Sequence, residues 1–143
     1  MTIAEARRRA AKAVEAFPDI RREVAEEMGP DIVEANRRQL MEGKDADGRE
    51  ISPGYSPFTV RMKNAKGQPA DRVTLFDTGA FQEGMFSEVE GDELVIDSRD
   101  GKSASLKKKY GDRIFGIGKE QGESLKRMSV HRIIVKIKEI TRF

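Results

Sequence analysis

Apolar and polar positions in the opening part of the chain follow the period of an α-helix. Thr2 precedes Glu5 by three residues, which is the spacing of a helix capping box, and the residues that follow are rich in Ala, Glu, Arg and Lys. Phe17-Pro18 predicts an interruption, because proline restricts the residue before it and suits the first turn of a new helix. A second helix is expected over residues 18 to 28.

A third helical stretch is expected after Gly29-Pro30. Ile32 and Leu40 belong to a mostly apolar face of this stretch, which extends to about Glu42. Proline kinks helices as well as ending them, so one long helix bent at Gly29-Pro30 is an alternative to separate pieces.

Residues 43 to 70 lack this periodicity and contain frequent glycine and proline. A segment of this length without periodicity predicts an extended loop or arm. Ser56-Pro57 is typical of a helix start, so we expect one helical turn over residues 58 to 63. The rest of the segment is expected to be mobile until a partner orders it.

The pattern then changes to that of a small antiparallel sheet. Residues 80 to 90 and 93 to 98 flank Glu90-Gly91-Asp92, where glycine supplies the positive φ of a tight reversal. We expect these two segments to pair as a β-hairpin. A short helix over residues 104 to 110 and an apolar turn at residues 114 to 117, packed into the core, are expected next.

The C-terminal segment, residues 119 to 143, fits two structures. Val130, Ile134 and Ile137 keep helical spacing, whereas Ile133, Val135 and Ile137 alternate as in a strand. Its length and its Glu, Lys and Arg content favour a helix.

Together these segments predict one α+β domain spanning residues 1 to 143. It comprises N-terminal helices, a long central loop or arm at residues 43 to 70, a small antiparallel sheet with a hairpin, and a C-terminal helix.

Charge and composition narrow the classes of function. The 27 basic and 25 acidic side chains nearly cancel, so no global field favours nucleic acid or a membrane as partner. The absence of cysteine excludes disulfides and thiolate chemistry, and the single histidine, His131, has no second ligand at metal spacing. No apolar segment of membrane-spanning length is present. We expect no cofactor, metal site or catalytic residue.

Two basic triplets, at residues 7 to 9 and 107 to 109, are candidates for contact with DNA phosphates. No aromatic residue interleaves with either triplet, so a solvated helix face is the favoured interpretation. A DNA-binding accessory protein remains an alternative function.

Asp77-Thr78-Gly79 matches the tripeptide that carries the catalytic aspartate of retroviral-type aspartic proteases. Such proteases hold the tripeptide among several strands, whereas here helices and a loop precede it. The favoured interpretation is a structural turn or helix cap formed by Asp77, Thr78 and Gly79. A protease that uses Asp77 is kept as a weaker alternative.

Two phrases in the middle of the chain carry a different resemblance. The first consists of Asp47-Gly48, Ile51, Pro53, Tyr55-Ser56, Thr59 and Lys63, and the second of Leu75, Asp77-Thr78-Gly79 and Phe81. In this order and spacing the chain resembles the virion-morphogenesis and tail-completion (head–tail joining) proteins of tailed bacteriophages. It departs from many members at Ile51, where they have tryptophan, and in lacking their Tyr-Ala-x-x-His-x-x-Gly segment.

The resemblance implies a non-enzymatic structural subunit that acts in tail completion or head–tail joining through ring assembly. The implied partners are further copies of the chain and other neck or tail proteins, and the implied location is the virion, assembled in the host cytoplasm. Subunits of a ring often extend a segment that packs on, or pairs with, the neighbouring subunit. Exposed aromatic side chains commonly mark such interfaces. The expected interface residues are Tyr55, Phe58, Thr59, Lys63 and Phe143.

Overall fold

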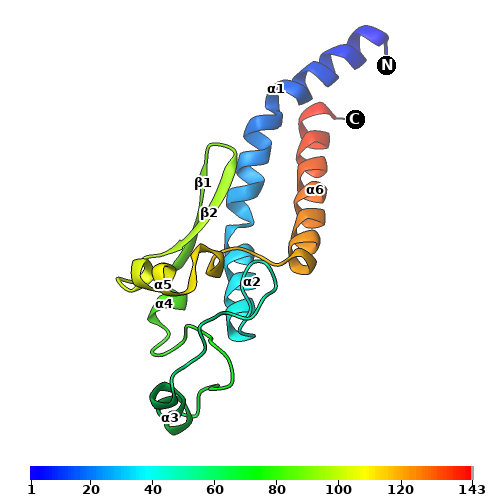
Figure 1. The fold of residues 1–143 in the computed structure, drawn as a ribbon. Coiled ribbons are helices and arrows are strands. Elements are labelled where there is room, and N and C mark those ends of the chain that lie inside the picture. Colours follow the sequence, from blue (N-terminus) through cyan, green and yellow to red (C-terminus); the bar gives the residue numbers. More distant parts are fainter. Residues whose placement is uncertain (143) are drawn as a thin grey trace.

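The computed structural model describes residues 1–142, so Phe143 lies outside the described residues (Figure 1). Its elements, in chain order, are α1 (Ile3–Glu27), α2 (Gly29–Met41), α3 (Pro57–Ala65), α4 (Ala80–Glu83), β1 (Met85–Glu90), β2 (Glu93–Ser98), α5 (Ser103–Tyr110), the 3-10 turn η1 (Asp112–Ile114) and α6 (Lys119–Thr141). These helices with a two-stranded antiparallel sheet confirm the predicted α+β class.

The predicted interruption at Phe17-Pro18 is wrong, because α1 continues through Pro18. The predicted capping box is present, with the Thr2 hydroxyl accepting from the Glu5 backbone N–H. Proline removes one helical hydrogen bond, and α1 bends in its N-terminal half (Figure 1). Tertiary packing of Ile20 and Val24 stabilises the helix beyond the proline.

Only Met28 separates α1 from α2, and the two helices run almost in line (Figure 1). The Met28 N–H donates to the Val24 carbonyl, and the Met28 carbonyl accepts from the Ile32 N–H, both at 3.0 Å. The bent-helix alternative therefore describes this junction better than separate helices. Pro30 is tolerated because it occupies the first turn of α2, where its missing N–H costs nothing.

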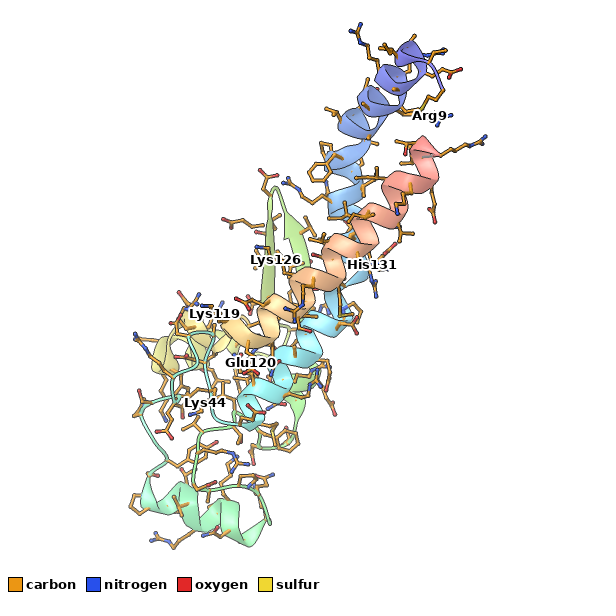
Figure 2. The ribbon with its side chains drawn as sticks, turned by 90° about the vertical axis from the view of Figure 1, so that its right-hand side faces the viewer. Arg9, Lys44, Lys119, Glu120, Lys126 and His131 are labelled. Carbon is orange, nitrogen blue, oxygen red and sulfur yellow. The ribbon has the colours of Figure 1, made fainter. Side chains whose placement is uncertain are left out.

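The C-terminal segment forms the helix α6, as predicted, and α6 packs antiparallel beside α1 (Figures 1 and 2). The buried side chains of Ile20, Val24 and Met28 form one apolar cluster. The partly buried residues packed against this cluster are Ala16, Ile32, Leu125, Ile133, Ile137 and Ile140.

A second apolar cluster lies at the α2 end of the molecule. Its buried members are Val33, Leu40, Ile51, Val73, Leu75, Phe81, Met85 and Ile114. Ile114 has no exposed surface, as expected for the apolar turn. Helix α1 contributes buried residues to the first cluster and α2 contributes buried residues to the second. The two successive helices therefore connect the two clusters.

The hairpin forms as predicted, with Met85 opposite Ser98 and Glu90 opposite Glu93. Gly91 has a φ of 61° at the reversal. The first strand begins later than expected, since residues 80 to 83 form α4 instead. The Ser98 hydroxyl donates to the Phe81 carbonyl at 2.7 Å and ties the strand to that helix.

The central segment is more structured than one helical turn in a loop. α3 has nine residues, and an isolated antiparallel bridge joins Lys44 to Glu50. Ala46 and Ile51 are buried and anchor the chain that leads to α3. α3 itself lies at the end of the molecule opposite both chain ends (Figure 1).

Candidate docking pocket

An open pocket of about 370 Å³ lies between α3, the turn around residues 75 to 81, and α5. Its lining is Tyr55, Phe58, Thr59, Met62, Lys63, Lys66, Leu75, Phe76, Asp77, Thr78, Gly79, Ala80, Phe81, Asp100, Lys102, Leu106 and Tyr110. The lining includes Tyr55, Thr59 and Lys63 of the first phrase on which the phage resemblance rests, and every residue of the second. Pockets of this size with apolar walls and few polar groups are typical of binding sites.

The first wall of the pocket is α3, whose start is fixed by local capping. The Ser56 hydroxyl accepts from the Thr59 N–H at 3.2 Å and also bonds the Thr59 hydroxyl at 3.0 Å. Phe58 and Met62, one helical turn apart, are 64% and 44% exposed. These two side chains give the pocket an apolar surface that nothing in the described chain covers.

Lys63 and Tyr55 have partners within the chain itself. The Lys63 ammonium donates to the Phe76 carbonyl and lies 5.2 Å from the centre of the Tyr55 ring. The Tyr55 hydroxyl accepts from the Thr74 N–H at 2.9 Å. Both residues therefore hold α3 on the turn, whereas Phe58 is the exposed member of the expected interface set within residues 1–142.

The second wall is the turn that contains Asp77, Thr78 and Gly79. Gly79 has a φ of 92°, a conformation that favours glycine, and a Cβ placed there would lie 3.2 Å from the Phe76 ring. The Thr78 hydroxyl accepts from the Ala80 N–H at 3.3 Å. The tripeptide is thus the predicted structural turn, and Gly79 caps the start of α4.

Asp77 is exposed at the pocket rim and its carboxylate forms an ion pair with Lys66. The hydrogen bond from Lys66, helped by its positive charge, lowers the pKa of Asp77 below the usual value of 3.8. In the described residues both strands follow Asp77, whereas a retroviral-type protease needs strands ahead of the tripeptide. The surroundings of Asp77 differ from that fold.

The third wall is α5, from which Leu106 and Tyr110 line the pocket. Asp100 and Lys102, just before the start of α5, also line it. Neither α5 nor Met62 was identified as part of a site from the sequence. The available signal was helical spacing, since Leu106 and Tyr110 are four residues apart, as are Phe58 and Met62. That α3 and α5 line the same pocket is a tertiary property that spacing does not reveal.

The candidate basic and histidine residues do not converge on this pocket. Lys107 forms an ion pair with Asp97 at 3.3 Å, and His131 is exposed on α6. Within residues 1–142, no group of His, Asp and Glu side chains is arranged to hold a metal ion. Nor does any described helix have the length and apolar character needed to cross a membrane.

The pocket can accept an apolar side chain against Phe58, Met62 and Leu106, with lysines beside it for a carboxylate or carbonyl oxygen. Its lining contains no histidine, the commonest general base. The pocket therefore combines an apolar floor with lysine ammonium groups at its rim. In comparisons with protein-family models, curated proteins and solved structures, no match to this chain is found.

Proposed function

We propose that this chain is a structural subunit of a tailed-phage virion, acting in tail completion or head–tail joining through ring assembly. The observation that carries the proposal is that Tyr55, Thr59 and Lys63 of the first phrase line one open apolar pocket together with the whole second phrase.

The position of the pocket supports a contact between neighbouring subunits. α3 lies at the end of the elongated molecule farthest from both chain ends (Figure 1). A contact between this end and a different surface of the next copy is heterologous, and such contacts close into rings when the rotation fits. The exposed Phe58 and Met62 supply the apolar centre that such an interface needs.

Phe58→Asp tests the proposal. Because the Phe58 ring is mostly exposed, its replacement should shift the melting temperature by no more than about 2 °C while weakening ring assembly at least about tenfold. Native mass spectrometry and electron microscopy of concentrated protein measure the ring. Val14→Asp, at an apolar position that is 74% exposed on α1, is the matched control and should assemble normally.

A ring that forms equally well in the Phe58→Asp protein would remove the pocket from the proposal. A chain that forms no closed oligomer, but binds duplex DNA with strong salt dependence, would favour the DNA-binding alternative instead.

A further inference from the structure

The α6 helix carries apolar side chains that its packing against α1 does not use. Met128, Val130, Ile134 and Val135 are between 41% and 48% exposed. Side chains on α6 that do contact α1, such as Leu125, Ile133 and Ile137, belong to the first apolar cluster. α6 is therefore apolar over a wider arc than one neighbouring helix covers.

One edge of the α1–α6 contact is closed by ion pairs. Lys136 lies 3.0 Å from Glu23 and 2.9 Å from Glu27, and Arg132 lies 3.8 Å from Glu27. At 100° per residue, Val130 and Ile134 project from the opposite edge of α6. That edge is the open one, and α6 is accessible along its length (Figure 2).

The open edge forms a stripe that has an acidic residue at its start and a basic residue at its end. Its positions, spaced by three or four residues, are Glu123, Arg127, Val130, Ile134 and Lys138. All five are exposed. When two such stripes run antiparallel about Val130, Glu123 of each falls opposite Lys138 of the other, and the Arg127 stem lies over Ile134.

We propose that a second copy of this chain docks on this stripe, with the two α6 helices antiparallel about a two-fold axis near Val130. Charge complementarity selects this occupant, because the acidic start and the basic end of the stripe match only in an antiparallel pair. A membrane surface or nucleic acid would gain nothing from Glu123. The pairing is independent of the pocket and of the proposed function.

The size of the contact sets its strength. A 23-residue helix is roughly 34 Å long and about 10 Å wide, so helix pairing alone covers roughly 350 Å² on each copy. Stable interfaces bury about 800 Å² per partner. The pair is therefore a weak dimer whose population rises with protein concentration.

Charge reversal tests the pairing by sedimentation velocity over a wide concentration range. Glu123→Lys and Lys138→Glu should each raise the dimer dissociation constant at least about fivefold, because each reversal affects two symmetry-related ion pairs. The double variant restores both pairs with reversed sign and should dimerise as the unaltered chain does. Far-UV circular dichroism checks that α6 stays folded in each protein.

Val130→Asp provides a second test, since it places two carboxylates together at the two-fold axis and should abolish the dimer. Val14→Asp and Phe58→Asp, which lie outside the stripe, should leave the dimer unchanged and so separate this contact from ring assembly. A chain that stays monomeric at its highest soluble concentration overturns the proposal. So does a dimer that is equally stable in both single charge reversals and the double variant.

Discussion

Tyr55 shows how one side chain fixes the position of α3. Its ring packs against the second apolar cluster, and its hydroxyl accepts from the Thr74 N–H at 2.9 Å. The buried Lys63 adds a hydrogen bond to the Phe76 carbonyl, two residues after Thr74. The pocket therefore has one wall held by a small number of polar contacts to the turn.

The hydroxyl of Tyr55 has a measurable role in stability. Tyr55→Phe keeps the ring but leaves the Thr74 N–H without this partner, so the free energy of unfolding should fall by about 1 kcal/mol. Urea denaturation measures the change. Phe58→Ala is the control, and its free energy of unfolding should stay within about 0.5 kcal/mol of the unaltered chain. A larger loss in Phe58→Ala than in Tyr55→Phe would mean that Phe58, too, packs within the subunit.

At the scale of elements, the chain between α2 and α3 is joined to η1 by one ion pair. Both carboxylate oxygens of Asp47 accept from Arg113, at 3.1 Å from Nε and 2.8 Å from Nη2. The hydrogen bond from Arg113 is the main reason that the pKa of Asp47 lies below its usual value of 3.8. The Ala46 N–H also donates to the Arg113 carbonyl at 2.7 Å.

This ion pair predicts a pH dependence in acid. A carboxyl whose pKa is lower in the folded chain contributes stability above its unfolded pKa, and that contribution is lost as the pH falls through the folded pKa. Asp47→Asn should therefore melt below the unaltered chain at about pH 6, and the gap should narrow as the pH falls below about 4. Thermal melts of both proteins across this range measure the difference, and a gap that is independent of pH would contradict the assignment.

At the scale of the whole molecule, two amide side chains of α2 hold the segment that leads into α6. Asn36 has no exposed surface; its Nδ2 donates to the Ile114 carbonyl at 3.0 Å, and its Oδ1 accepts from the Gly116 N–H at 2.9 Å. Gln39, one turn later, bonds the Gly116 carbonyl at 3.1 Å and the Gly118 N–H at 2.7 Å. These contacts join parts of the chain nearly 80 residues apart.

Asn36→Ala should lower the free energy of unfolding by about 2–4 kcal/mol, because it leaves the buried Ile114 carbonyl and the partly buried Gly116 N–H without partners. The exposed Arg38 on the same helix offers a control, and Arg38→Ala should change the value by less than about 0.5 kcal/mol. Chemical denaturation followed by circular dichroism measures both. Equal stability of the two variants would show that water replaces the amide at Ile114 and Gly116.

Local chemistry in the sequence was enough to predict several features. The capping box at Thr2 and Glu5, the Ser56 cap, the reversal at Gly91 and the turn at Gly79 each depend on residues within a few positions of one another. Helical spacing in α6 also outweighed the competing strand pattern, because 23 residues exceed the usual length of a strand.

Tertiary structure decided the remaining features. Local rules predict a break at Pro18, but burial of Ile20 and Val24 against α6 stabilises the helix beyond it. The same limit applies to the pocket: the sequence marked Phe58 and the Asp77 turn separately, and neither indicated that Leu106 and Tyr110 on α5 would face them. Packing depends on which surfaces meet after the chain has turned, and that is a property of long-range contacts that residue spacing along the chain does not encode.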